Sequence, residues 1–173
     1  MLELGQPGGG DDEESAPSCL RFAVATRWPC LERLVLSCRT LKLADLDPVL
    51  TGEAIPNVRQ LGLRDCEFAD ALCGVLPGSR VASQLRTLDL SRGMMTDRGA
   101  RTLARLADSL RALEVLDATS NYLSPDGVQM LQRRFRRVVS GEQLRMVPCI
   151  PGSIPVEEYL SERGYLCERG EDD

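Results

Sequence analysis

The stretch LRTLDLSRGMMTDRGARTLARLA, residues 85–107, contains two hydrophobic periods in succession. At its start, Leu88 and Leu90 alternate with polar residues, which is the period of a strand that buries one face. From Gly99 to Leu106, small and apolar residues recur every three or four positions, which is the period of an amphipathic helix. The stretch therefore predicts a short strand followed by a helix.

The strand part of this stretch has counterparts elsewhere in the chain. Four segments follow the pattern apolar-x-x-apolar-x-apolar, with starts 27, 27 and 28 residues apart, at Leu31, Val58, Leu85 and Leu113. Ten residues after each start stands a further apolar side chain: Leu41, Phe68, Met95 or Leu123. A fixed period of this length indicates stacked repeats, because one strand and one helix cannot bury their apolar faces alone.

These segments resemble the leucine-rich repeat family, and their period is similar to that of its ribonuclease-inhibitor-like class. The resemblance covers residues 28–141, and residues 95–104 and 121–131 are similar to the turn into the helix in that class. It implies an α/β fold, namely a leucine-rich repeat solenoid shaped as a partial horseshoe. Such a solenoid would have about four strand-helix repeats and a parallel concave sheet.

The resemblance also assigns structural roles in the turns. Eight residues after each start, the class places Asn or Cys, and this chain has Cys66 in the second repeat and Asn121 in the fourth. We expect both as structural turn positions, with the Asn121 side chain bonded to backbone groups of its loop. The first and third repeats depart from the pattern, with Arg39 and Gly93 in that place.

Two helix starts are marked by the residues themselves. Thr96 and Ser124 stand where an N-cap is needed, and Pro125 suits the first helical position. Asp97 and Asp126 place negative charge against the positive end of each helix dipole. The third and fourth repeats should therefore each contain a helix that begins at these positions.

Length and composition predict one folded domain with two tails. The chain has 173 residues, of which 43% are hydrophobic, and this is enough for one buried core. We divide it into an acidic, glycine-rich leader with an N-terminal cap (1–27), a repeat domain (28–141) and a C-terminal extension with an acidic tail (142–173). Residues 19–24 are expected to cover the first repeat, and residues 137–140 predict a last short strand.

The net charge of -5 is unevenly distributed. Residues 28–141 contain 16 Arg or Lys and 13 Asp or Glu, whereas the remaining residues contain 5 and 13. The acidic ends should be solvated, and we expect no nucleic-acid partner. A dense basic cluster remains open to two interpretations: a solvated helix end that suits the helix dipole, or a contact for phosphate or an acidic protein. Its members are Arg133, Arg134, Arg136 and Arg137.

Catalytic and cofactor-binding motifs are absent from the sequence. The chain has no histidine, the commonest general base, and no catalytic triad, phosphate loop or dinucleotide glycine pattern. Its seven cysteines include no Cys-x-x-Cys pair, which argues against a zinc site. Asp89 and Asp117 are the only carboxylates in equivalent places that suggest an acid-base pair, and a binding surface explains them better. We expect no enzyme activity, no metal and no cofactor.

The sequence predicts a cytoplasmic protein with no membrane partner. No apolar run approaches the ~20 residues that cross a bilayer, and the first residues lack the basic start and apolar core of a secretory signal. Most cysteines should then be reduced, and those within repeats should be buried. A reactive thiol at Cys66 and a metal site built from distant cysteines are the alternatives.

The candidate binding site is the exposed side of the four predicted strands, which becomes the concave face of the solenoid. Arg33 and Arg64 in its first half, with Asp89 and Asp117 in its second, make a face of split polarity. Such a face suits a protein or peptide with charges in the complementary order. The residues that we select are Arg33, Val35, Gln60, Arg64, Thr87, Asp89, Val115 and Asp117.

The sequence therefore predicts a non-catalytic protein-protein interaction module that binds its partner through the concave face of the repeat sheet. Two alternatives remain. The chain could be a substrate-recognition subunit of a larger complex such as a ubiquitin ligase, as leucine-rich repeat proteins with Cys at the turn position sometimes are. It could also be a structural remnant of a longer solenoid, which the small number of repeats suggests.

Overall fold

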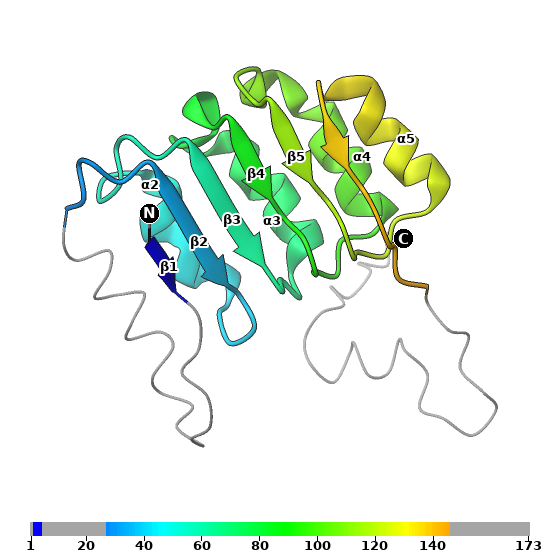
Figure 1. Cartoon of the computed structure of the whole chain (residues 1–173), viewed down its shortest axis with the longest axis horizontal. Helices are drawn as coiled ribbons and strands as arrows, with labels where there is room; N and C mark the ends of the chain where they lie inside the picture. Colours follow the sequence, from blue (N-terminus) through cyan, green and yellow to red (C-terminus); the bar gives the residue numbers. More distant parts are fainter. Residues whose placement is uncertain (1, 5–26, 146–173) are drawn as a thin grey trace, which may run out of the picture.

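The chain folds around a single parallel sheet in the computed structural model, which describes residues 2–4 and 27–145 (Figure 1). Among these residues the sheet has six strands, and each strand pairs in parallel with the next one along the chain. They are β1 (Leu2–Leu4), β2 (Arg33–Ser37), β3 (Gln60–Arg64), β4 (Thr87–Asp89), β5 (Val115–Asp117) and β6 (Val138–Val139). The predicted α/β class with a parallel sheet is therefore confirmed.

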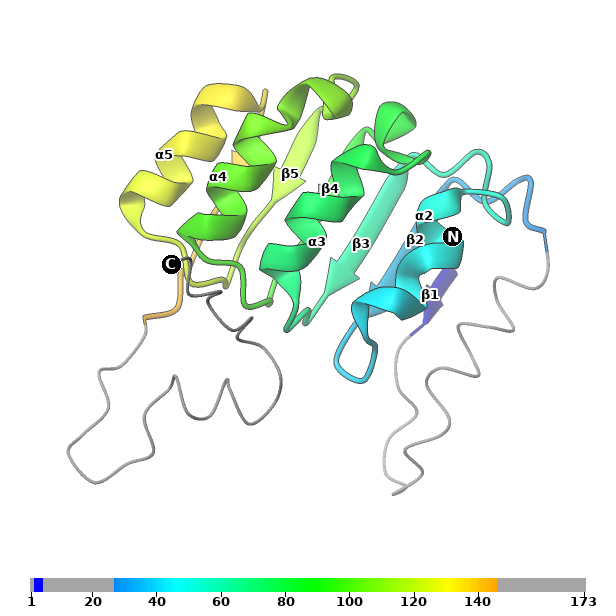
Figure 2. The same cartoon turned by 180° about the vertical axis from the view of Figure 1, so that it is seen from behind.

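Helices connect consecutive strands from β2 onward and lie on one side of the sheet (Figure 2). The α-helices are α2 (Asp47–Thr51), α3 (Ala69–Val75), α4 (Asp97–Arg105) and α5 (Pro125–Arg134). Short 3-10 helices accompany them: η1 (Leu43–Leu46), η2 (Leu76–Gly78), η3 (Ala82–Gln84) and η4 (Ala107–Leu110). No helix of the described residues covers the other side of the sheet, which we call the open face (Figure 1).

The leucines of the sequence pattern pair across the sheet. The strand register aligns Leu34 with Leu61, Leu61 with Leu88, and Leu88 with Leu116. Their side chains are at most 3% exposed, and burial of each contributes about 1.5–3 kcal/mol. The core is thus built on a row of leucines between the sheet and the helices. Its register is the one that the spacing of the sequence segments predicts.

The strands β3 to β6 are each followed by a turn that contains a left-handed residue. The φ angle is 54° at Asp65, 59° at Arg92, 54° at Ser120 and 47° at Glu142. This conformation costs a residue with a side chain roughly 1 kcal/mol. The backbone N–H of the first three donates to a carbonyl in the following turn at 2.9 to 3.2 Å, so bonds between turns offset the strain. Neither glycine nor asparagine marks these positions, and the sequence analysis did not predict them.

Helices α4 and α5 begin where the sequence predicts. The Thr96 hydroxyl accepts a hydrogen bond from the backbone N–H of Arg98 at 3.2 Å. The Ser124 hydroxyl accepts one from the N–H of Gly127, also at 3.2 Å, and Pro125 is the first residue of α5. Both predicted N-caps are confirmed.

Two aspartates link the start of one helix to the start of the next. Asp70 in α3 accepts hydrogen bonds from the backbone N–H of Thr96 at 2.8 Å and from its hydroxyl at 2.6 Å. Asp97 in α4 contacts Ser124 in the same way, at 2.9 and 2.6 Å. Gly127 leaves room for this contact, because a Cβ there would overlap the Asp97 carboxylate. From the sequence we expected Asp97 to act only on the dipole of its own helix, so this link was not predicted.

The two ends of the sheet differ in how well they were predicted. Strand β6 confirms the last strand expected at residues 137–140. Strand β1 was not predicted, because Leu2-Glu3-Leu4 is too short for its alternation to stand out, yet it pairs with β2. Residues 19–24, expected to cover the first repeat, lie outside the described residues, as does the C-terminal extension from residue 146 onward.

Candidate functional site

The candidate site lies on the open face, where the strand register arranges the selected residues in rows. One row crosses β2 to β5 in the order Arg33, Gln60, Thr87, Val115. The second row runs Val35, Gly62, Asp89, Asp117. Arg64 lies at the end of β3, paired in register with Ser37. The register therefore brings all eight selected residues onto neighbouring strands.

A shallow depression of about 40 Å³ lies within these rows. Five of the eight selected residues line it: Arg33, Val35, Gln60, Thr87 and Asp89. Gly62 of β3 also lines it. The depression thus gathers selected side chains from three neighbouring strands, β2, β3 and β4.

Val35 is buried, whereas we expected an exposed side chain. It is 6% exposed, because its methyl groups lie over Gly62, 3.1 and 3.2 Å from where a Cβ of that residue would stand. Glycine on the neighbouring strand thus lets valine fold down against the sheet. Val35 forms an apolar floor for the depression, and the polar residues around it form the rim.

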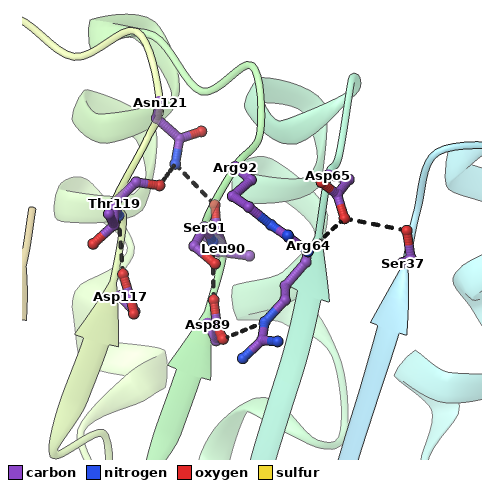
Figure 3. A network of polar contacts seen from close by, with 10 residues as sticks. All are labelled: Ser37, Arg64, Asp65, Asp89, Leu90, Ser91, Arg92, Asp117, Thr119 and Asn121. Carbon is purple, nitrogen blue, oxygen red and sulfur yellow. Dashed lines mark hydrogen bonds and ion pairs between the residues drawn. The ribbon is translucent and has the colours of Figure 1, made fainter. Parts of the chain in front are cut away.

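Arg64 and Asp89 form an ion pair across β3 and β4, with 2.8 Å between Nε and Oδ2 (Figure 3). Their side chains are 30% and 16% exposed, so the pair is partly shielded from water. The sequence analysis placed these two charges in opposite halves of a split face. In the structure they neutralise each other at the centre of that face.

Competing effects act on the pKa of Asp89. Burial raises it, but the hydroxyl and backbone N–H of Ser91 and the guanidinium of Arg64 all donate hydrogen bonds to the carboxylate. Together these donors hold the pKa of Asp89 below its ordinary value. The ion pair with Arg64 therefore persists to lower pH than an isolated aspartate would allow.

Arg33 and Asp117 are the two selected charges that the ion pair leaves over. Neither forms an ion pair with another residue of the described ranges. They lie on β2 and β5, with the Arg64–Asp89 pair on the strands between them. Across β2 to β5, the selected charges on the outer two strands thus lack an ion-pair partner among the described residues, and those on the two strands between them are paired.

Asp89 and Asp117 also shape the ends of their own strands. Asp89 accepts a hydrogen bond from the backbone N–H of Ser91 at 3.0 Å, and Asp117 accepts one from that of Thr119 at 2.9 Å (Figure 3). The spacing Asp-x-Ser/Thr occurs at the ends of both β4 and β5 and could have predicted this local turn. Each aspartate therefore has a structural role beside any role in binding.

A second polar group, not selected from the sequence, lies at the upper edge of the open face. The Asp65 carboxylate accepts hydrogen bonds from the Ser37 hydroxyl at 3.2 Å and from the guanidinium of Arg92 at 2.9 Å (Figure 3). The guanidinium of Arg39 approaches it to 3.9 Å. These residues come from three successive turns. Their equivalent positions after successive strands could have predicted this group, because the turns after parallel strands meet at one edge of the sheet.

Asn121 is fully buried and bonds the backbone, as expected. Its Nδ2 donates to the carbonyls of Leu90 and Ala118 at 2.8 and 3.2 Å, and its Oδ1 accepts from the N–H of Met95 at 2.9 Å. One turn later, Gln143 makes similar contacts. Its Nε2 donates to Ala118 at 2.9 Å and its Oε1 accepts from the N–H of Leu123 at 3.2 Å. The sequence did not lead us to predict this role of Gln143.

Cys66 is also buried at its turn position. A hydrogen bond with Cys38, together with burial, raises the pKa of the Cys66 thiol far above its usual range. The thiolate is the nucleophilic form of cysteine. These surroundings favour the structural role over the alternative of a reactive thiol.

The described residues contain neither a group of His, Cys, Asp and Glu side chains arranged as metal ligands nor a helix suited to crossing a bilayer. No three such ligands gather within residues 2–4 and 27–145. None of the helices there combines the length and hydrophobicity that spanning requires.

Comparisons with known proteins bear on the fold. No family model matches the chain, and no curated protein shows a significant match. Among solved structures, the chain is similar to a crystal structure of a Bacteroides fragilis protein, a Northeast Structural Genomics Consortium target, with a TM-score of 0.68 and 24% sequence identity. The match covers 75% of this chain and 39% of that one. The chain thus spans less than half of that protein, and the likeness supports the α/β fold alone.

Proposed function

We propose that this chain is a leucine-rich repeat module of the ribonuclease-inhibitor-like class that binds a protein partner, without catalysis, through the open face of its sheet. The 27 to 28 residue sequence period supports the repeat assignment, since it coincides with the strand register. Similar left-handed turns after β3 to β6 support it as well.

One observation carries the binding proposal: the polar side chains of β2, β3 and β4 surround a depression on a face that no described helix covers. Arg33, Gln60, Thr87 and Asp89 form its rim above the apolar floor of Val35. A volume of about 40 Å³ suits the tip of one side chain rather than a small-molecule substrate. Solenoids of stacked repeats commonly bind macromolecules on such extended faces.

The charges define the partner that fits best. Arg33 and Asp117 stand at opposite sides of the face, and the Arg64–Asp89 pair in the centre is already neutral. A protein or peptide with an acidic group opposite Arg33 and a basic group opposite Asp117 would match both. Complementary charges of this kind set specificity and association rate more than total affinity.

The test begins with affinity purification of the partner from the native cell, followed by binding measurements on purified components. The open-face variant exchanges both charges, Arg33→Glu with Asp117→Arg, and leaves the net charge unchanged. We expect its affinity to fall about tenfold or more, mainly through slower association and altered salt dependence. Its free energy of unfolding should fall by about 0.5–1.5 kcal/mol, because Asp117→Arg removes the acceptor of the Thr119 backbone N–H, whereas the change at the exposed Arg33 should cost less than about 0.5 kcal/mol.

The matched control is Arg101→Glu with Asp126→Arg, which makes the same exchange on exposed positions of helices α4 and α5. This variant should bind the partner like the parent chain. Equal loss from both variants, or no loss from the open-face variant, would exclude the open face as the binding site.

A further inference from the structure

Figure 2 shows the edge of the molecule where the strands begin and the helices end. A groove of about 830 Å³ is lined by residues of this edge. It contains none of the residues selected on the open face. Two acidic residues, Asp108 and Glu114, lie in it among a larger number of arginines. The arginines of this edge groove are Arg59, Arg86, Arg111, Arg133, Arg134 and Arg136.

The strand register places part of this charge in a row. Arg59, Arg86 and Glu114 each come directly before a strand, and the backbone carbonyls of the two arginines accept hydrogen bonds from the following strand at 3.1 and 3.0 Å. Neighbouring strands lie ~4.8 Å apart, so like charges on Arg59 and Arg86 stand side by side. Arg111 and Arg133 line the groove from the helical layer.

Half of the six arginines are engaged within the protein. Arg86 forms an ion pair with Glu114 at 2.7 Å. Arg134 bonds the carbonyl of Ala104 at 3.1 Å and approaches Asp108 to 3.4 Å. Arg133 donates to the Gln129 side chain on its own helix at 2.8 Å. Favourable placement at the negative end of the α5 dipole accounts for Arg133 and Arg134 without any ligand.

The other half have no such explanation. Arg59, Arg111 and Arg136 are exposed and form no ion pair with any residue that the structure describes. They come from three different repeats, so the end of one helix cannot account for them. Their shared feature is the groove, which gathers three uncompensated guanidinium groups on one concave surface.

We propose that the edge groove binds an acidic, extended segment of a partner protein. A guanidinium group can form two parallel hydrogen bonds with one carboxylate, and this geometry adds specificity to the attraction between the charges. Arginines in a groove therefore suit a ligand that carries carboxylates. A peptide can also place its backbone N–H groups against Asp108 and Glu114, which remain 95% and 47% exposed. The site is separate from the open face and adds a second contact to the proposed function.

Nucleic acid fits the same groove less well. Single strands are held largely by stacking of bases on aromatic side chains, and Phe135, the aromatic residue of the groove, is only 7% exposed. The phosphodiester backbone of a nucleic acid also has no N–H group that could donate to the carboxylates of Asp108 and Glu114, whereas a peptide backbone has such donors.

The experiment uses a fluorescent peptide of alternating Glu and Ser, with a Gln-Ser peptide and an oligouridylate as comparison ligands. Binding to the full chain is measured by fluorescence anisotropy over a range of salt concentrations. The groove variant replaces Arg59, Arg111 and Arg136 by Gln. The control replaces Arg98, Arg101 and Arg105, exposed on α4, by Gln and so removes the same charge.

The parent chain should bind the Glu-Ser peptide at low salt, more weakly as salt rises, and should not bind the Gln-Ser peptide. The groove variant should bind about tenfold more weakly, as three exposed charge contacts acting together would imply. The α4 control should stay within about twofold of the parent. Circular dichroism and the thermal midpoint should show that both variants remain folded.

Three results would overturn the proposal. One is absence of binding by the parent chain at low salt, and another is equal loss in the groove and α4 variants. The third is tighter binding of oligouridylate through the same arginines, which would make the groove a nucleic-acid site. The open-face variant should bind the peptide like the parent, so the two proposals fail independently.

Discussion

The carboxylate of Asp97 in helix α4 bonds both the backbone N–H and the hydroxyl of Ser124, at 2.9 and 2.6 Å, and so joins the starts of two neighbouring helices. Ser124 is the N-cap of α5. The side chain that orders this helix start is therefore itself held by the preceding helix.

Replacement of Asp97 by alanine should lower the free energy of unfolding by about 1–3 kcal/mol, because two partly buried donors of Ser124 lose their acceptor. Urea unfolding followed by circular dichroism measures the change. The control is Asp126→Ala, since Asp126 is exposed in the first turn of α5. It should cost less than about 1 kcal/mol, the scale of a favourable charge at a helix end. Equal costs for the two variants would contradict the cross-link.

The Asp89 carboxyl should titrate below its ordinary pKa of 3.8 in the folded protein. Since folding lowers this pKa, the resulting stabilisation is present at pH values above 3.8 and is lost as the pH falls through the lowered value. An NMR titration of the Asp89 carboxyl carbon reads the pKa directly. Arg64→Gln should raise it by removing the guanidinium charge that stabilises the carboxylate, and Arg86→Gln, in the exposed pair with Glu114, should not. Titration of the parent at or above 3.8 would refute the assignment.

The cysteines should separate into reactive and protected groups. Cys30 is exposed, whereas Cys38, Cys66 and Cys73 are buried, and all four are free thiols. Burial, with the neighbouring charge of Asp70, raises the pKa of Cys73 to about 12. Iodoacetamide should modify Cys30 in the folded chain and the buried three only after denaturation, as peptide mass spectrometry can show. Labelling of Cys66 as fast as Cys30 would favour the reactive-thiol alternative.

Features that depend on regular patterns along the chain were predicted correctly. Alternation at Leu88 and Leu90 indicated a strand, and the equal spacing of four segments indicated which leucines pair across the sheet. The N-caps at Thr96 and Ser124 were also predicted correctly. The strand and the N-caps follow from residue types within one strand or one helical turn, and the pairing follows from a fixed period along the chain.

Features that break the period were missed. Gln143 follows Asn121 by only 22 residues, because α5 ends at Arg134 and the chain turns directly into β6. A search at 27 or 28 residues passes over it. The left-handed turns at Asp65, Arg92 and Ser120 were missed for another reason. Hydrogen bonds between turns stabilise them, and no glycine marks any of the three positions.

The sequence by itself determined the alternation of strands and helices, the order of the core leucines and the set of residues on the open face. Only the tertiary structure decided which of those residues are available to a partner. Arg64 and Asp89 neutralise each other, Val35 is buried over Gly62, and Arg33 and Asp117 remain unpaired within the described chain. The physical reason is that ion pairing and burial depend on distances between side chains on neighbouring strands. Spacing along the chain sets which strands are neighbours, but the side-chain conformations across the sheet set those distances.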